Sequence, residues 1–326
     1  MVAKEAGVPP STASRVLNGT AVVNGAKKQA IDAAVVKLGY VPNPMARGLA
    51  GGRTLSIGVV TQALDSPFYG PAMRGIEEEL LPAGYNALFV SGHWNAAAEA
   101  RCISVLQSRR VDGIIVVTGR LASAALVDLA AAQPVVITGR TLQAPGLYSL
   151  DFDNFQGGQL ATQHLLQLGH RRIAFISGDG DHPDAMERMR GYRATLGTAG
   201  IAYDPALVVP GDYLEVSGLL AVERLLQTQQ HFTAIFAAND QMALGAVLGL
   251  QRHALRVPED VSVVGFDDLA ASPYTSPPLS SVQQPAYELG GAAAAAMLQL
   301  LAGAEPDVRL PQPRPVVRES SRLVRG

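Results

Sequence analysis

The chain has 326 residues, of which 48% are hydrophobic and 17% charged, and this is enough for two or three domains with a large buried core. Its single cysteine, Cys102, excludes a disulfide framework and a cysteine-based zinc site. The net charge of −2 is unevenly distributed, because residues 1–54 carry +5 and the remaining residues −7, which favours a polyanion-binding module at the N-terminus. No apolar run reaches the roughly 18–20 residues of a membrane span and no signal peptide is present, so we expect a cytoplasmic protein without membrane association.

Residues 1–41 are predicted to form a small helical head. Residues 2–8 lead into a turn, residues 11–18 give a second helix that ends at Asn18-Gly19, and Asn24 caps a third helix that ends at Gly39. A glycine-containing turn before a helix that carries Ser, Thr and Arg is what a helix-turn-helix requires. Together with the positive charge, this arrangement predicts DNA binding.

Residues 42–54 interrupt the regular elements. Pro42-Asn43-Pro44 breaks the chain, and residues 45–50 have room for only one or two helical turns before Gly51-Gly52. So short a segment is not stable as an isolated helix. We expect a conditional helix within a linker.

From residue 55 onward, apolar strands alternate with amphipathic helices. Near-continuous Val/Ile runs between helices are typical of parallel strands covered on both faces, and two such units in tandem predict two doubly wound α/β subdomains. Ligands of this fold class bind beyond the carboxyl ends of the strands. We expect strands or extended segments at 55–61, 87–91, 113–117, 135–138, 147–152, 172–177, 234–237 and 262–266, and helices at 69–81, 96–107, 123–131, 156–168, 186–199, 216–228 and 240–253.

The sequence carries none of the common enzyme signatures. No G-x-G-x-x-G follows the first strand, and there is no Walker A loop, no H-E-x-x-H helix and no G-x-S-x-G elbow. The six histidines do not have metal-ligand spacing. We therefore predict no enzymatic activity and no cofactor.

Four segments carry a resemblance that covers essentially the whole chain. Residues 6–18 resemble the helix-turn-helix, residues 38–49 the hinge helix, and residues 238–246 and 257–268 two core segments of the LacI/GalR family of ligand-responsive bacterial transcription regulators. Residues 65–70 and 184–192 are similar to its galactose-repressor branch. The implied domains are a helix-turn-helix head (1–41), a hinge helix and linker (42–54), and an N-terminal (55–152 and 283–311) and a C-terminal (153–282 and 312–326) sensor subdomain of the type I periplasmic-binding-protein kind.

The resemblance implies a repressor that leaves a palindromic operator when a small sugar binds between the sensor subdomains. In its second helix, Arg15 would contact guanine, the commonest specific contact, and in the hinge helix Leu49 would enter the minor groove. Pro9-Pro10 replaces the usual capping serine and a base-reading side chain, so the operator should differ from those of relatives. The first helix of the family begins several residues earlier, so either the start at Met1 is misassigned or DNA binding is weakened. The expected DNA-binding residues are Ser11, Thr12, Ser14, Arg15, Asn18, Asn24, Tyr40, Asn43, Ala46 and Leu49.

The resemblance also implies the effector site. Arg188 and Asp267 would pair across the ligand, with Asn239 as donor and acceptor, and aromatic rings would stack on a pyranose. Carboxylates at positions 184 and 267, with few cations nearby, favour a neutral sugar over a phosphorylated one. Gly139 replaces an acidic contact of some sugar-binding members, which leaves the sugar open. The expected effector-binding residues are Phe68, Tyr69, Phe152, Asp184, Arg188, Tyr213, Asn239, Asp267 and Gln284.

The expected partners are operator DNA, a small-molecule effector and a second copy of the chain. We expect a homodimer, because no heptad segment follows the last residues to tether a tetramer. Two alternatives remain open: a periplasmic-type sugar-binding protein, which has the same two-lobed fold, and a regulator that uses its ligand as a corepressor. A dehydrogenase is disfavoured by the missing phosphate-binding loop.

Overall fold

A computed structural model describes residues 1–17, 24–40 and 53–324. The expectations for Asn18, Asn43, Ala46 and Leu49, and for a hinge helix in the 42–54 linker, fall on or depend on residues outside these ranges. Among the residues that are described, no helix combines the length and the apolar character needed to cross a membrane.

The N-terminal head contains the three predicted helices: α1 (Val2–Glu5), α2 (Pro10–Leu17) and α3 (Gly25–Leu38). Their apolar faces bury Val2, Ala13, Ile31 and Ala34 in a small core. Gly7 allows the turn between α1 and α2, because its φ of +62° is readily accessible only to glycine. The caps of α3 are as predicted: Asn24 Oδ1 accepts a hydrogen bond from Ala26 N (3.3 Å), and Gly39, left-handed at φ +54°, ends the helix.

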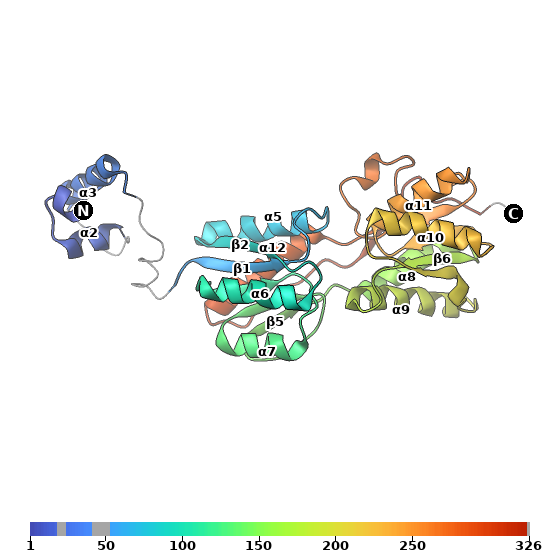
Figure 1. The fold of residues 1–326 in the computed structure, drawn as a ribbon, viewed down its shortest axis with the longest axis horizontal. Helices are drawn as coiled ribbons and strands as arrows, with labels where there is room; N and C mark the ends of the chain where they lie inside the picture. Colours follow the sequence, from blue (N-terminus) through green and yellow to red (C-terminus); the bar gives the residue numbers. More distant parts are fainter. Residues whose placement is uncertain (18–23, 41–52, 325–326) are drawn as a thin grey trace.

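The N-terminal sensor subdomain is a parallel sheet with helices on both faces (Figure 1). The five strands lie in the order β2-β1-β3-β4-β5. Successive side chains of a strand point to opposite faces, so the sheet contributes to two separate cores. The strands are β1 (Ser56–Thr61), β2 (Asn86–Ser91), β3 (Gly113–Val116), β4 (Val135–Thr138) and β5 (Leu147–Leu150), and the helices are α5 (Tyr69–Leu80), α6 (Ala96–Ser108), α7 (Ser123–Ala132) and α12 (Ala286–Leu301).

The C-terminal sensor subdomain repeats the architecture with a four-stranded parallel sheet in the order β7-β6-β8-β9. Figure 1 shows it beside the first subdomain. An antiparallel pair, β10 (Ser281–Gln283) with β11 (Arg314–Val316), lies where the chain crosses between the two. The strands are β6 (Ile173–Ser177), β7 (Val208–Pro210), β8 (Ala234–Ala237) and β9 (Ser262–Val264), and the helices are α8 (Asn154–Gln167), α9 (Pro183–Thr198), α10 (Glu215–Gln227) and α11 (Asp240–Arg252).

The doubly wound fold is confirmed, and the ends of the predicted elements differ from the observed ones by at most three residues. Among the α-helices and strands of the described residues, β7, β10, β11 and α12 were not predicted. Although α12 comes after residues 153–282 of the C-terminal subdomain in sequence, it packs against α5 of the N-terminal subdomain. This packing requires glycine, because a Cβ at Gly290 would lie 1.9 Å from the carbonyl oxygen of Ala72.

Candidate effector pocket and DNA-binding head

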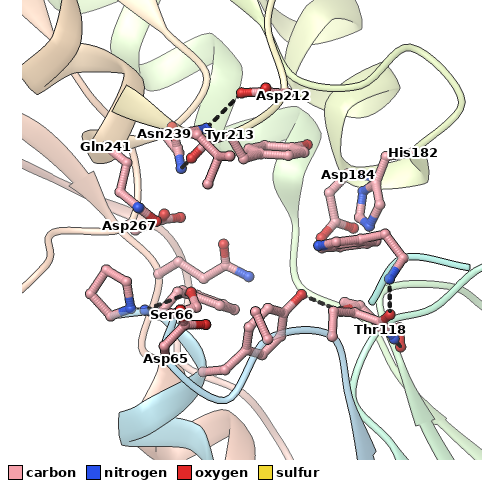
Figure 2. A pocket seen from close by; sticks show the side chains of 18 of the residues that line it. Asp65, Ser66, Thr118, His182, Asp184, Asp212, Tyr213, Asn239, Gln241 and Asp267 are labelled. Carbon is pink, nitrogen blue, oxygen red and sulfur yellow. Dashed lines mark hydrogen bonds between the residues drawn. The ribbon is translucent and has the colours of Figure 1, made fainter. Parts of the chain in front are cut away.

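A cavity of about 490 Å³ lies between the two sensor subdomains (Figure 2). Its walls are mostly loops that follow the carboxyl ends of the parallel strands, the expected ligand position in this fold. The N-terminal subdomain contributes Gln62, Ala63, Asp65, Ser66, Pro67, Phe68, Tyr69, His93, Trp94 and Thr118, the C-terminal subdomain contributes His182, Asp184, Arg188, Asp212, Tyr213, Leu214, Glu215, Asn239, Gln241 and Asp267, and Gln284 comes from the crossover after β10.

Arg188 is held rigidly at the wall of the cavity. Its Nε donates to Asn154 Oδ1 (2.8 Å) and its Nη2 to Gln284 Oε1 (2.7 Å), while Nη1 donates to the carbonyl oxygen of Ala238. The guanidinium also lies over the ring of Phe266, 3.7 Å from its centroid. Four fixed contacts leave this arginine little freedom to reorganise around an anionic ligand.

Asp267 contacts Arg188 directly, with 3.7 Å between Oδ1 and Nη1. Both residues belong to the C-terminal subdomain, whereas the sequence predicted a pair that faces across a ligand. The backbone of Asp267 is bonded to the crossover: its N–H donates to the carbonyl oxygen of Val282 (2.8 Å), and its own carbonyl accepts from Gln284 N (3.2 Å). The carboxylate is therefore fixed beside the segment that joins the subdomains.

Asp184 and Asp267 are both 7% exposed, and no described residue donates a hydrogen bond to either carboxylate. Burial raises the pKa of Asp184 to about 6, and Arg188 and Arg140 oppose this rise. Burial likewise raises the pKa of Asp267 well above its usual range, against the attraction of Arg188. A buried carboxylate without donors is costly, so the cavity favours a ligand that supplies them.

Aromatic rings from both subdomains line the cavity. Trp94 and Tyr213 lie nearly parallel, with centroids 6.5 Å apart and 16° between their planes. His182 meets Trp94 edge to face at 4.8 Å, and burial, followed by Arg188, lowers its pKa to about 3, so that it is neutral near pH 7. Phe68 and Tyr69 add a second edge-to-face pair at 5.3 Å.

Trp94 was not predicted from the sequence. Both it and His93 have left-handed backbones, with φ of +54° and +51°, which are uncommon for residues other than glycine. Gln62 stabilises this turn, because its Oε1 accepts from Trp94 N (2.9 Å) while its Nε2 donates to the carbonyl oxygen of Thr118 (2.9 Å). One available signal was that the only tryptophan of the chain follows a predicted strand.

The structure brings together eight of the nine expected effector residues: Phe68, Tyr69, Asp184, Arg188, Tyr213, Asn239, Asp267 and Gln284. Phe152 differs from the expectation, because its ring packs edge to face against Phe266 in the core and does not line the cavity. Both polar groups of the Asn239 side chain already have protein partners. Its Oδ1 accepts a hydrogen bond from Met242 N (2.9 Å) as the cap of α11, and its Nδ2 donates to the carbonyl oxygen of Tyr213 (2.9 Å).

The expected DNA-binding residues of the described head lie mainly on its surface. Ser11, Ser14 and Arg15 are exposed on α2, and Arg15 Nε donates to the carbonyl oxygen of Ser11 (3.2 Å). Thr12 is half-buried. The exposed residues at the start of α3 include Asn24, Lys27 and Lys28, and Tyr40 is exposed just after this helix.

Family models match nearly the whole chain. The model described as "Bacterial regulatory proteins, lacI family" matches residues 2–43, and the one described as "Periplasmic binding proteins and sugar binding domain of LacI family" matches residues 54–320. This chain belongs to the LacI family. It is a transcriptional regulator of that family, with a DNA-binding helix-turn-helix ahead of a periplasmic-binding-protein-like sensor domain.

Individual LacI-family members are similar over almost their full length. The chain is 37% identical to the HTH-type transcriptional regulator CelR of Thermobifida fusca, over 98% of this chain and 97% of that one. It is 35% identical to catabolite control protein A of Priestia megaterium, over 90% and 89% of the two chains. Among solved structures, the Lac repressor dimer bound to operator and the anti-inducer ONPF superposes with a TM-score of 0.89 at 30% identity, and 98% of each chain is covered.

Proposed function

We propose that this LacI-family protein is a homodimeric repressor that binds a palindromic operator and is released when a neutral sugar occupies the cavity between its sensor subdomains. The observation that carries the proposal is the pair of buried carboxylates, Asp184 and Asp267, which face the cavity and accept no hydrogen bond from the described residues. The hydroxyl groups of a sugar are donors of the required kind. The proposed activity involves no chemical reaction.

The charge of the cavity supports a neutral ligand rather than a phosphorylated one. Five carboxylates line it, and Arg188 is the only Arg or Lys among the described lining residues; each of its three nitrogens already donates to a protein oxygen. A phosphate group would meet repulsion without a free cation to offset it. Sugar binding is also described for relatives: one solved structure is a CelR–cellobiose complex, and another is a LacI-family regulator from Enterococcus faecium with bound ribose.

The proposed effector contacts are the eight expected residues at the cavity together with Trp94. The proposed DNA contacts are those expected on α2 and α3, with Tyr40 and the hinge positions as further candidates. The domain limits stay as expected at 1–41, 42–54, 55–152 with 283–311, and 153–282 with 312–326. Helix α12 packs on α5, which supports the assignment of residues 283–311 to the N-terminal sensor subdomain. Strand β10 packs on α8, which supports ending the first segment of the C-terminal subdomain in β10, at residue 282. Because its target is chromosomal DNA, we place the protein in the cytoplasm.

The experiment that tests the proposal is an operator-binding titration in the presence of sugars. Operator fragments would first be selected from a random DNA library with the purified full-length chain, and fluorescence anisotropy would then follow one fragment against a panel of neutral sugars and their 6-phosphates. We expect a neutral sugar to weaken operator binding, by the roughly 5–150-fold that is usual for allosteric coupling. A sugar that tightens operator binding would show a corepressor instead, and binding of sugar phosphates alone would contradict the neutral ligand.

A further inference from the structure

Trp94 belongs to the N-terminal subdomain but packs against rings of the C-terminal one. It lies in the turn after β2, and its ring meets His182 edge to face at 4.8 Å and lies nearly parallel to Tyr213 at 6.5 Å between centroids. Figure 2 shows these two partners on one side of the cavity and Thr118 on the other. Aromatic rings with centroids about 4.5–7 Å apart attract one another beyond the area that they bury. The indole ring of Trp94 therefore makes a contact that bridges the two subdomains.

The turn that carries Trp94 has an unfavourable backbone and is held by Gln62. His93 and Trp94 are both left-handed, a strain that persists only where the surrounding structure enforces it and that is common at switch regions. Gln62 is fully buried, and its main-chain oxygen accepts a hydrogen bond from His93 N (3.1 Å) while its Oε1 accepts from Trp94 N (2.9 Å). Its Nε2 donates to the carbonyl oxygen of Thr118 (2.9 Å), just after β3. Gln62 thus ties the position of the indole to the sheet of its own subdomain.

The two partner rings are fixed as well. Nδ1 of His182 accepts a hydrogen bond from Asp184 N (3.2 Å), so that His182 is the N-cap of α9. Tyr213 is left-handed at φ +70°, and its ring packs on Gly178, where a Cβ would lie 2.2 Å from the ring carbon Cζ. Rings that are already fixed lose little conformational freedom when they meet, so their contact retains most of its energy.

We propose that Trp94, His182 and Tyr213 form a latch that holds the two sensor subdomains together, and that Gln62 is the positioning residue of this latch. The inference goes beyond the proposed function, because the latch consists of protein groups alone and does not depend on which ligand the cavity accepts. Sensing then starts from subdomains whose relative position the protein itself favours.

A second contact joins the subdomains on the same side. Arg120 of the N-terminal subdomain forms an ion pair with Asp179, which lies on the same loop as His182. The backbone N–H of His182 donates to the carbonyl oxygen of Asp179 (2.9 Å), so the ion pair and the latch are attached to one turn. Separation of the subdomains on this side requires both contacts to break.

The fluorescence of Trp94 tests the latch, because it is the only tryptophan of the chain. Acrylamide quenching would be measured on the sugar-free, full-length protein. Asp179→Arg places a like charge opposite Arg120, so it should separate the subdomains and make quenching about twofold stronger than in the parent. Asp181→Arg is the matched control, because it makes the same charge change at an exposed neighbour, and it should behave like the parent. Equal quenching in the two variants would show that Trp94 is shielded by its own subdomain and would overturn the latch.

Variants of Gln62 test its positioning role. Gln62→Met loses the side-chain hydrogen bonds to Trp94 N and to Thr118, so it should release the indole and raise quenching while the ion pair stays intact. Gln62→Glu keeps an acceptor for Trp94 N and should stay closer to the parent, and it serves as the test if the Met variant does not fold. In the Gln62→Met background, Asp179→Arg should add little, because the latch is already released. Full additivity, or unchanged quenching in both Gln62 variants, would overturn the role of Gln62. Because no sugar is used, these results do not depend on the proposed function.

Discussion

Arg120 and Asp179 form an ion pair that joins the two sensor subdomains beside the effector cavity, Arg120 from the loop after β3 and Asp179 from the loop after β6. The loop that carries Arg120 is fixed by hydrogen bonds to Glu99. This fully buried carboxylate accepts hydrogen bonds from the backbone N–H groups of Arg120 (2.8 Å) and Leu121 (3.0 Å). The ion pair therefore links a rigid part of one subdomain to the other.

Breaking this ion pair should favour separation of the subdomains. A partly exposed pair contributes about 0.2–1 kcal/mol, so Asp179→Asn should raise the Kd of the sugar by up to about fivefold. Calorimetry in low salt measures the effect, which should disappear near 1 M salt because of screening. Asp181→Asn, an exposed neighbour, is the control. The charge reversal Arg120→Asp with Asp179→Arg should restore affinity, and a double variant no better than the single ones would refute the link.

Asp184 should make the stability of the sugar-free protein depend on pH. Its pKa is about 6 in the folded protein against 3.8 as the ordinary value, so ionisation opposes folding above pH 6, and the opposition vanishes below pH 4, where both states are protonated. Asp184→Asn should thus be more stable than the parent at pH 8, by up to about 3 kcal/mol, and equally stable at pH 4. Thermal unfolding from pH 4 to 8 measures the difference; a gap that stays constant with pH would contradict the prediction.

Asp267 should be needed for sensing and not for operator binding. Asp267→Ala removes a hydrogen-bond acceptor from the buried wall of the cavity and leaves Arg188 without its ion pair, which should cost a few kcal/mol of sugar affinity. Calorimetry with the best sugar and anisotropy with operator distinguish the roles. Normal sugar binding would show that Asp267 is structural, and loss of operator binding without sugar would show that it supports the fold or the dimer.

Arg15 should determine the preference for one base pair of the operator. Arg15→Ala should lose about 1–3 kcal/mol of discrimination at that position. Arg15→Lys keeps the charge but lacks the planar fork, so it should lose discrimination while retaining the salt dependence of binding. Binding to a set of single-base operator variants tests both, and an unchanged preference at every position would exclude this residue as a base contact.

The sequence was sufficient for elements that carry a strong local pattern. The Val/Ile runs of β1, β3 and β4 predicted the first sheet, and the Asn24 cap and Gly39 stop predicted α3. It was insufficient where a distant contact decides the structure. Gly290 of α12 resembles a helix breaker, but glycine is required there because the backbone of α5 approaches it closely at Ala72.

The same distinction applies to the cavity. Charged residues at strand ends, such as Asp267, were predictable because the fold class assigns ligands to that edge. The position of Trp94 depends on a left-handed turn that Gln62, more than thirty residues away, stabilises through a side-chain hydrogen bond. The direction of the Phe152 ring depends on Phe266, and no local pattern encodes a contact between residues so far apart in sequence.

Hydrogen bonds join Asp267, a proposed effector contact, to Val282 and Gln284, where the chain crosses between the two sensor subdomains. The linker to the head leaves from the opposite end of the N-terminal sheet, because it precedes the start of β1 while the cavity follows the ends of the strands. A six-residue strand such as β1 spans about 20 Å. Any rotation of the N-terminal subdomain about this crossover would therefore act over at least the length of the strand. Such a rotation would move the start of β1, where the linker ends, further than it moves Asp267.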